Sequence, residues 1–410
     1  MSLCRFCRAP LNHSVVNLGA TAIANDLLSP EQLTQMEPTY PLHAMVCEKC
    51  WLVQLDTDAA ASHIFGQDYV YFSSFSASWL QHAEKYAAEM RTRFHLGPQS
   101  LVMEVASNDG YLLQYFQRAG IAVLGIEPSG SVAAAAKEKN IPTQIEFFNR
   151  AFAKKYLASG GQQADLITAN NVMAHVPDVN DFVAGFTSAL KPAGVLTIEF
   201  PHLLNLIREC QFDTIYHEHY SYYALVSAQR LLAAHGLTIF DVEELPTHGG
   251  SLRVYAMHRD TSLHPITPRV GAMLERERAA GMETLEFYQG FAARVIEIKC
   301  ALLEFLIDAR RQGKKVVGYG APAKGNTLLN YCGIGPELLA YTVDRSPHKQ
   351  NKFLPGSRIP IRAPEYINAD KPDYVLVLPW NLAAEISQQL AHIYDWGGQF
   401  VVPIPSIKVF

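Results

Sequence analysis

The stretch LVMEVASNDG, residues 101–110, decides the fold of this chain. LVMEV is a short apolar run with the length of a buried strand, and the SNDG after it is turn chemistry. The YLLQYFQRAG that follows has a helical pattern, with Gly120 as the expected residue at the helix end. The stretch therefore predicts a strand, a tight turn and a helix, which together open a parallel α/β sheet.

The alternation of strands and helices continues downstream. Further strands are expected at residues 122–127, 165–169 and 195–200, and helices at residues 131–139 and 178–194. Strands that alternate with helices in this way imply a doubly wound parallel sheet. Ligands of such sheets bind beyond the carboxyl ends of the strands, so the polar residues that follow each strand are the candidates for a site.

A second alternation begins after Gly313. Strands are expected at residues 314–320, 339–344, 373–379 and 399–405, and a helix is expected at residues 380–394. The last hundred or so residues therefore resemble a second, Rossmann-like domain. Two long helices are expected outside the α/β segments, at residues 76–94 and 282–311.

Composition limits the class of protein. The 410 residues are too many for one hydrophobic core, so about two or three domains are expected. The net charge is −5, and no basic run is long enough to follow a nucleic acid. The opening MSLCRFCRAP is not followed by the apolar segment of a signal peptide, and no apolar stretch reaches the roughly 18 residues of a membrane span. We expect a cytoplasmic protein, a monomer or small homo-oligomer, with no membrane or nucleic-acid partner.

Two C-x-x-C pairs lie near the N-terminus, Cys4 with Cys7 and Cys47 with Cys50. Each pair can straddle a tight turn so that both sulfurs face one ion, which predicts a tetrahedral zinc site. The alternatives are four ordinary buried thiols or two disulfides. The other cysteines are isolated and are interpreted as core residues in a reducing compartment; they are Cys210, Cys300 and Cys332.

Polar residues follow three of the predicted central strands. Glu104 and the Ser107–Gly110 turn resemble the first motif of class I S-adenosylmethionine-dependent methyltransferases, although Ala106 and Ser107 stand where a G-x-G is more usual. A dinucleotide-binding fold is the rival, and the missing G-x-G-x-x-G argues against it. The resemblance implies a set of cofactor-binding residues: Glu104, Ser107, Asn108, Asp109, Gly110, Glu127 and Asn170.

The densest polar cluster of the chain, Y-H-E-H-Y-S-Y-Y at residues 216–223, follows the last of these strands. The H-E-H invites a second metal, but a metalloprotease needs H-E-x-x-H on a helix. A purely structural cluster is a further alternative. Acid–base chemistry is the better interpretation, because histidine titrates near neutral pH, a carboxylate can orient it, and tyrosine can donate to a developing oxyanion.

An ordered series of motifs resembles the nucleoside-diphosphate-sugar C-methyltransferases of deoxysugar biosynthesis, over essentially the whole chain. The motifs are the two C-x-x-C pairs, E-x-x-S-N-D-G, H-V-P at 175–177, I-Y-x-E-H at 215–219, L-P-x-H-G-G at 245–250, V-G-Y-G-A-x-A-K at 317–324, C-G-I-G-P at 332–336 and D-x-x-x-x-K-Q-N at 344–351. The resemblance implies methylation of a carbon, most often carbon 3, of a TDP-linked 4-keto-deoxysugar. Methylation at such a carbon needs a base that forms an enolate and donors that hold the enolate oxygen.

The same resemblance implies the catalytic residues. His219 is the candidate base with Glu218 as a supporting carboxylate, and Tyr216 and His175 are candidate donors to the keto oxygen. Tyr71, in V-Y-F-S-S, matches a substrate-pocket tyrosine. The alternatives are packing between modules for Tyr71 and an ordinary core histidine for His175. His217 stands where relatives have an acidic residue, so its role stays open.

The nucleotide end of the substrate is expected at the C-terminal domain. Residues 318–327 follow a strand and open a helix, whose N-terminus can cradle a diphosphate, although the turn is not a P-loop. A degenerate turn kept only for packing is the alternative. The candidate substrate residues are His248, Gly250, Arg253, Gly320, Lys324, Asn326 and Lys349.

These inferences divide the chain into five expected segments. They are a zinc-binding module (1–56), a helical linker and substrate-pocket segment (57–95), a methyltransferase domain (96–260), a helical connection (261–312) and a Rossmann-like nucleotide-sugar-binding domain (313–410). Two other functions stay open: an O- or N-methyltransferase on another small molecule, and a non-catalytic protein that binds zinc and a nucleotide.

Overall fold

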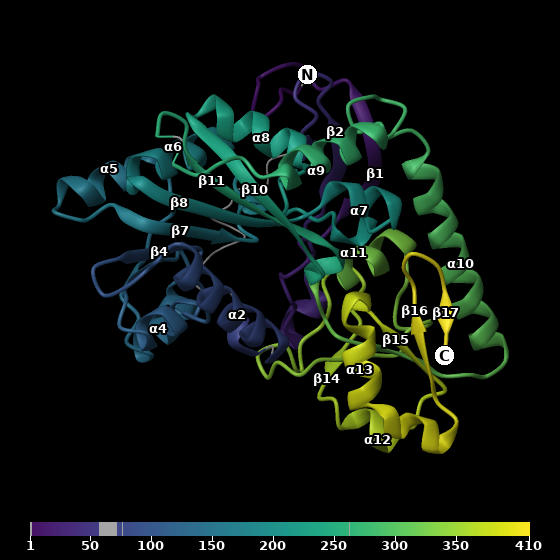
Figure 1. The fold of residues 1–410 in the computed structure, drawn as a ribbon. Coiled ribbons are helices and arrows are strands. Elements are labelled where there is room, and N and C mark those ends of the chain that lie inside the picture. The colour runs from purple at the N-terminus through teal and green to yellow at the C-terminus, as the bar shows by residue number, and fades with distance from the viewer. Residues whose placement is uncertain (1, 57–71, 76, 262) are drawn as a thin grey trace.

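A computed structural model describes residues 2–56, 72–75, 77–261 and 263–410. Its central feature is a seven-stranded sheet with strand order β10-β11-β8-β7-β4-β5-β6 (Figure 1). The strands are β4 (Leu101–Val105), β5 (Ala122–Ile126), β6 (Thr143–Gln144), β7 (Ala164–Asn170), β8 (Leu190–Pro201), β10 (Leu237–Leu245) and β11 (Ser251–His258). β4 to β8 are parallel, and β11 is antiparallel to β8 and to β10. This arrangement confirms the predicted doubly wound methyltransferase fold.

Helices cover both faces of this sheet, because each presents an apolar stripe to it. One face packs against α5 (Arg150–Ala158), α6 (Val179–Ala189) and α8 (Leu225–Ala234). The opposite face packs against α2 (Ala77–Arg93), α3 (Leu113–Arg118) and α4 (Gly130–Glu138). The switch in strand order, where polar groups can reach a ligand, lies between β4 and β7.

The C-terminal sheet has the order β14-β13-β12-β15-β16-β17. Its strands are β12 (Val316–Tyr319), β13 (Thr342–Val343), β14 (Ile361–Arg362), β15 (Tyr374–Val377), β16 (Gln399–Val402) and β17 (Lys408–Val409), and its helices are α11 (Ala323–Cys332), α12 (Tyr366–Asp370) and α13 (Ala383–Gln389). All pairs are parallel except the last, β16 with β17, which the sequence did not predict. The strand order reverses between β12 and β15.

Three predicted helices differ from the observed ones. The helix expected over residues 178–194 ends at Ala189 as α6, and residues 190–194 belong to β8. The helix expected from residue 282 begins later, as α10 (Phe291–Arg311), because Gly290 before it adopts a left-handed φ of 79°. A further helix, α9 (Pro268–Ala279), precedes it and was not predicted. The helix expected over residues 380–394 is divided into a short turn, α13 and a second turn, Ala391–Trp396.

The N-terminal module contains β1 (His13–Thr21), β2 (Tyr40–Val46) and β3 (Val53–Leu55). These strands form an antiparallel sheet whose fourth strand, β9 (Ser221–Tyr222), comes from the end of the polar cluster in the central domain. The remaining short helix of the central domain, α7 (Leu203–Arg208), packs nearby.

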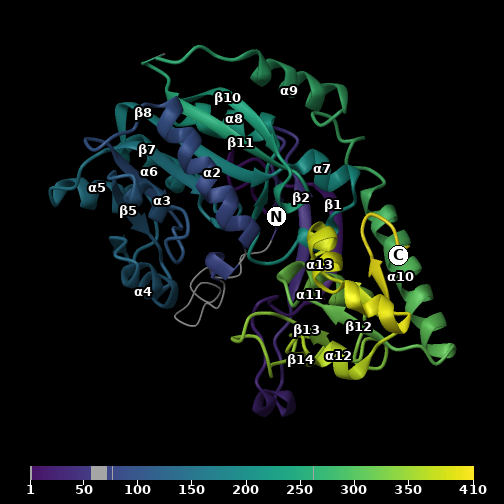
Figure 2. The ribbon, with the colours of Figure 1, turned by 60° about the horizontal axis from the view of Figure 1, so that its bottom comes forward.

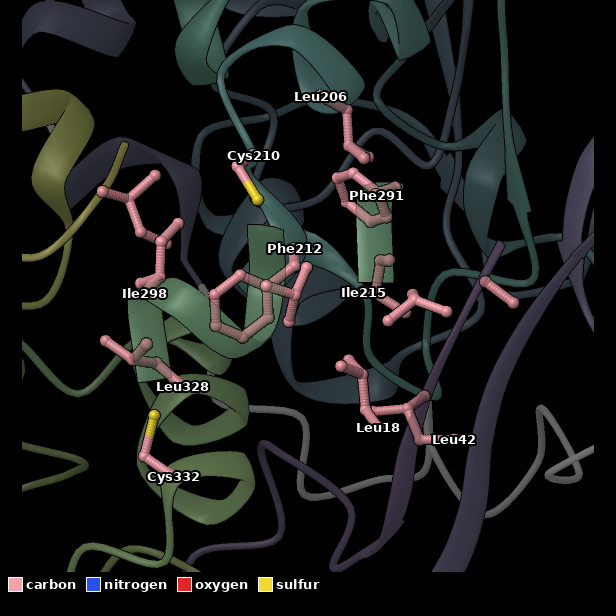
Figure 3. Close-up of a cluster of buried hydrophobic side chains, with 14 of the residues drawn as sticks. Leu18, Leu42, Leu206, Cys210, Phe212, Ile215, Phe291, Ile298, Leu328 and Cys332 are labelled. Atoms are coloured by element: carbon pink, nitrogen blue, oxygen red, sulfur yellow. The ribbon is translucent and has the colours of Figure 1, made fainter. Parts of the chain in front are cut away.

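One hydrophobic core crosses the expected segment boundaries. It joins Leu18 and Leu42 of the N-terminal sheet to Phe212 of the central domain, Phe291 of α10 and Leu328 of α11 (Figure 3). Figures 1 and 2 show β1 beside α10 and α11, which lie far from it in sequence. This core therefore packs the N-terminal module against the central domain and the C-terminal sheet. None of the helices in the described part of the chain has an apolar stretch long enough to cross a membrane.

Candidate active site

The four N-terminal cysteines converge on one point. Their Sγ atoms all lie within 4.8 Å of one another, with 3.5 Å between Cys4 and Cys50 and between Cys7 and Cys47. These separations are too long for disulfides (about 2.05 Å) and fit a tetrahedral zinc with Zn–S bonds of about 2.3 Å. The two turns are alike: the fourth residue after each first cysteine, Arg8 and Trp51, has a φ of 62°. The donor set therefore fits zinc.

The turn after β4 is held in shape by Glu127. Its two carboxylate oxygens accept hydrogen bonds from the backbone N–H of Asn108 and of Ser129, both at 2.9 Å. Ala106 and Asn108 adopt positive φ angles of 58° and 49°, which keep the turn tight. Burial raises the pKa of Glu127 to about 7. Each oxygen keeps a second lone pair, so the carboxylate can also accept from a ligand.

Several buried polar atoms around this turn lack a hydrogen-bond partner among the described residues. They are Glu104 Oε2, Ser107 Oγ, Asp109 Oδ1, Asn170 Nδ2 and both side-chain polar atoms of Asn171. They lie at the carboxyl ends of β4 and β7 or directly after them, and these are the two strands at the switch in strand order. Burial raises the pKa of Glu104 well above its usual range, and the charges of Asp109 and Glu127 add to this. A cationic ligand with hydrogen-bonding groups, such as S-adenosylmethionine, would satisfy these groups.

Asn171 belongs to the same strand end as Asn170 but was not among the residues assigned to the cofactor. Its φ is 54°, and both polar side-chain atoms are buried. The signal in the sequence is the Asn-Asn pair after a buried strand. An asparagine adopts the left-handed conformation more readily than most residues, so the pair allows a turn there.

A short turn before α2 covers the cofactor loop. The backbone N–H of Ser73 donates to Asn108 Oδ1 at 2.9 Å, and that of Ser74 donates to Asp109 Oδ2 at 3.3 Å. Phe72 stacks on His348 of the C-terminal domain, with ring centroids 5.4 Å apart. The residues of this turn and Phe72 before it therefore contact both the central domain and the C-terminal domain. Tyr71, predicted for the substrate pocket, lies outside the described residues.

His219 is held by hydrogen bonds at both ring nitrogens. Its Nδ1 lies 2.9 Å from the carbonyl oxygen of Thr214, which can only accept, so Nδ1 carries the proton. Its Nε2 lies 2.8 Å from the hydroxyl of Tyr216 and accepts from it. Burial holds the pKa of His219 well below its usual range, with further lowering by His175, whose ring lies 4.6 Å away. The imidazole is therefore neutral and has its lone pair on Nε2.

The neighbours of His219 in the sequence turn elsewhere. Glu218 accepts a hydrogen bond from Asn25 Nδ2 at 2.7 Å, and burial raises its pKa to about 7. His217 Nε2 donates toward the carbonyls of Tyr40 and Pro41 on β2. Both side chains therefore join the polar cluster to the N-terminal module. The arrangement brings Tyr216 to His219 and leaves Glu218 apart from it.

Tyr222 is a residue that the prediction omitted although it belongs to the same cluster. Its ring lies 6.1 Å from that of His219, and its hydroxyl is buried. Burial raises its pKa well above the usual range, so the hydroxyl stays protonated. It is a potential donor beside the base.

The C-terminal domain brings a half-buried cation to this region. Lys324, in the first turn of α11, donates to Asn381 Oδ1 at 2.6 Å and lies 4.8 Å from the centre of the Trp380 ring. Its charge helps to lower the pKa of both His219 and His248, although burial is the larger cause. Gly320 makes the preceding turn with a φ of 87°, and a Cβ there would lie 2.7 Å from Pro379. The first turn of α11, at the switch in strand order of the C-terminal sheet, therefore lies close to the histidines of the central domain, His219 and His248.

The other predicted substrate residues have varied surroundings. His248 has a φ of 54° and packs edge-on against Trp79, and burial lowers its pKa to about 4. A side chain at Gly250 would clash with Asn205. Asn326 Oδ1 is buried without a partner among the described residues, whereas Lys349 Nζ donates to the carbonyl of Ala321 at 2.8 Å.

Arg253 occupies an internal ion-pair network. Its guanidinium binds Glu199 at 2.7 and 2.6 Å and approaches Glu89 and Glu243 at 3.5 and 3.4 Å. His82 of α2 lies 3.0 Å from the same Glu199. The charge of Arg253 is compensated by these carboxylates. Its side chain therefore joins β8, β11 and α2.

Known families match three successive parts of the chain. Residues 4–65 match the family described as "Putative zinc binding domain", residues 79–242 match a methyltransferase domain, and residues 246–405 match the C-methyltransferase C-terminal domain. With the site above, they define an S-adenosylmethionine-dependent methyltransferase that carries a structural zinc.

A relative that matches almost the whole chain identifies its family. The chain is 36% identical to the C-methyltransferase NovU of Streptomyces niveus over 406 residues, which cover 99% of this chain and 96% of NovU. The chain therefore belongs to the C-methyltransferase family, and it is an enzyme of that class.

More distant matches cover less than half of the chain. A ubiquinone biosynthesis O-methyltransferase of Rhodopseudomonas palustris is 24% identical over 163 residues, which are 35% of this chain and 64% of that protein. A solved S-adenosylmethionine-dependent methyltransferase of Thermotoga maritima has 15% identity and a TM-score of 0.36, covering 48% of this chain and 99% of that one.

Proposed function

We propose that this C-methyltransferase acts on a nucleotide-linked 4-keto-deoxysugar, TDP-linked and methylated at carbon 3. The observation that carries the proposal is the hydrogen bonding of His219, which leaves a basic Nε2 beside Tyr216. Carbon becomes a nucleophile only after it loses a proton, and a proton next to a ketone is acidic enough when the enolate is stabilised. A neutral histidine among hydroxyl donors suits this step.

In this mechanism His219 Nε2 takes the proton from the carbon next to the ketone. The Thr214 carbonyl accepts from Nδ1 at 2.9 Å and so stabilises the imidazolium that forms. The Tyr216 hydroxyl turns from His219 Nε2 to the keto oxygen when the substrate binds, and together with His175 it donates to that oxygen and holds the enolate. S-Adenosylmethionine, held by Glu104, Glu127, Asn170 and the 107–110 turn, supplies the methyl group.

The nucleotide part of the substrate is assigned to the edge of the C-terminal sheet. Lys324 supplies a half-buried cation, and Asn326 supplies a buried amide, in the first turns of α11. A helix N-terminus after a glycine turn is a site that favours phosphate oxygens. His248 and the Gly249–Gly250 turn lie between β10 and β11 of the central sheet, and we assign them to the sugar or diphosphate part of the substrate.

Incubation with labelled S-adenosylmethionine and a panel of TDP-, GDP- and CDP-linked 4-ketosugars tests the substrate. A new carbon-bound methyl signal in the NMR spectrum of one ketosugar product is expected. A methoxy or N-methyl signal, or no turnover of any ketosugar, would contradict the proposal.

The role of the base is tested with His219→Asn. A positioned base contributes about 10²–10⁴-fold, so turnover should fall by that factor while cofactor affinity stays unchanged. In heavy water, the wild-type protein should exchange the proton next to the ketone, and the variant should not. His235→Asn is the matched control, because His235 is hydrogen-bonded to Asn180 on a remote face. Exchange by His219→Asn at the control rate would place the base elsewhere.

A further inference from the structure

A hydrogen bond between two domains lies behind the candidate base. Trp380, in the turn after β15, donates from Nε1 to Asp213 Oδ2 at 2.7 Å. Asp213 belongs to the short turn Phe212–Thr214, directly before the polar cluster, and is fully buried. Neither residue was predicted from the sequence, and neither belongs to the proposed chemistry.

Asp213 is joined to His219 through the next residue. Thr214 supplies the carbonyl that accepts from His219 Nδ1 at 2.9 Å. The Thr214 hydroxyl donates to the carbonyl of Gln211 at 2.7 Å, and its N–H donates to the same carbonyl at 3.1 Å, so the turn is closed on itself. A shift of Asp213 would therefore move the carbonyl that orients the imidazole.

The contact between the domains is tightly fitted on both sides. A Cβ at Gly249, whose φ is 84°, would lie 2.6 Å from Trp380 Cη2 and 2.8 Å from Gln211 Nε2. Gln211 Nε2 donates to the Gly249 carbonyl at 2.9 Å. The ring of Phe212 packs edge-on against Tyr331 of α11, with centroids 5.4 Å apart. The indole is thus fixed between the turn of Asp213 and the turn of His248.

The same indole contacts the residue assigned to the substrate. Lys324 Nζ lies 4.8 Å from the ring centre of Trp380. Asp213 keeps one carboxylate oxygen, Oδ1, without a partner among the described residues. Burial raises the pKa of Asp213 to about 6, against the charge of Lys324 and the hydrogen bond from Trp380. A buried carboxylate is costly, so the hydrogen bond from Trp380 and the charge of Lys324 help to hold Asp213 in place.

We propose that Trp380 and Asp213 are a positioning pair, through which the C-terminal domain holds the Thr214 carbonyl and so fixes the proton of His219 on Nδ1. The pair acts through Thr214 and touches neither the cofactor nor the reacting atoms. The proposal rests on the proposed role of His219 as the base. It implies that the nucleotide-binding edge and the base are mechanically connected.

The first measurement needs no substrate. Nitrogen-15 NMR of the imidazoles, with the His219 signals assigned from the His219→Asn protein, reports which ring nitrogen carries the proton. The wild type should show the Nδ1–H form, and Trp380→Phe should show a mixture of forms. Trp396→Phe is the matched control, because Trp396 Nε1 donates to the Pro372 carbonyl at 3.1 Å, away from the site. An unchanged His219 tautomer in Trp380→Phe overturns the proposal.

A second pair of variants separates positioning from folding. Asp213→Asn keeps an acceptor oxygen for the indole, whereas Asp213→Ala removes it. Proton exchange next to the ketone should fall about tenfold in Asp213→Ala and in Trp380→Phe, as expected for a lost hydrogen bond, and should recover in Asp213→Asn. Equal losses in the Asn and Ala variants would overturn the pairing. If the wild type exchanges no proton on any ketosugar, the substrate proposal fails. The tautomer measurement still decides whether Trp380 and Asp213 position His219.

Discussion

The backbone N–H of Leu55 donates a 3.0 Å hydrogen bond to the carbonyl of Tyr220. Leu55 is the last residue of β3 in the zinc-bearing module, and Tyr220 directly follows His219. The next two residues, Ser221 and Tyr222, pair with Gln54 and Val53 of that strand. Gln54 also donates to Cys4 Sγ at 3.2 Å. The metal site and the candidate base are therefore linked through one short strand.

Removal of zinc should loosen this strand. In Cys50→Ser we expect zinc content to fall from about one per chain, because one thiolate of four is lost. The melting temperature should fall, and the amide of Leu55 should exchange with heavy water faster. Cys300→Ser is the control, since Cys300 is exposed and outside the cluster. Full protection of Leu55 in a zinc-free variant would show that the strand pairing does not depend on the metal.

Glu127→Ala should weaken binding of S-adenosylmethionine about tenfold or more. The carboxylate accepts from Asn108 and Ser129, so its loss removes a ligand acceptor and loosens the cofactor turn. Hydrogen bonds to a charged group are worth about 1.5–3 kcal/mol. Isothermal titration calorimetry measures the affinity, and Glu138→Ala, on the exposed side of α4, is the control. Equal affinities of the two variants would remove Glu127 from the cofactor site.

Much of the fold could be predicted because the strands carry their own signal. The apolar runs of β4, β7 and β15 are short and bounded by turn residues, so period and length identify them. β9 could not be predicted, because its two residues become a strand only by pairing with β3, about 170 residues earlier in the chain. β17 likewise depends on its pairing with β16.

The candidate site divides in the same way. Glu104, Glu127 and Asn170 could be predicted, since each stands at a strand end in a fold whose ligand edge is known. Trp380 and Asp213 could not, because their contact joins residues 167 positions apart and no motif marks either one. The surroundings of Arg253 could not be predicted either, because its carboxylate partners come from separate elements.

Glu218 should give the protein a measurable pH dependence of stability. Burial raises its pKa from 4.5 to about 7 on folding. The folded state then holds the proton longer, so the wild type loses stability as the pH rises from about 4.5 to about 7. Glu218→Gln cannot titrate, and its unfolding free energy relative to wild type should rise across that window, by up to about 1.4 kcal/mol per pH unit. Denaturant titrations at several pH values measure this.

The control for this prediction is Glu138→Gln, because Glu138 lies on the exposed side of α4. The two variants should differ most above pH 7 and least near pH 4.5. A constant difference between Glu218→Gln and wild type over the whole range would mean that the Glu218 carboxyl titrates alike in the folded and unfolded states.

Lys324→Met should change both substrate affinity and the pH profile of turnover. Removal of the ammonium takes a positive charge from the neighbourhood of His219, so the pKa of His219 should rise. A base must be unprotonated to act, so the acid limb of the kcat profile should move to higher pH, by up to about one pH unit. Loss of a cation from the proposed diphosphate site should raise KM about tenfold or more. Lys299→Met is the matched control. Lys299 is on the outer helix α10, and its Nζ also lies 4.8 Å from an aromatic ring centre, that of Tyr331 on α11. A raised KM with an unmoved acid limb would limit Lys324 to substrate binding, and two unchanged parameters would remove it from the site.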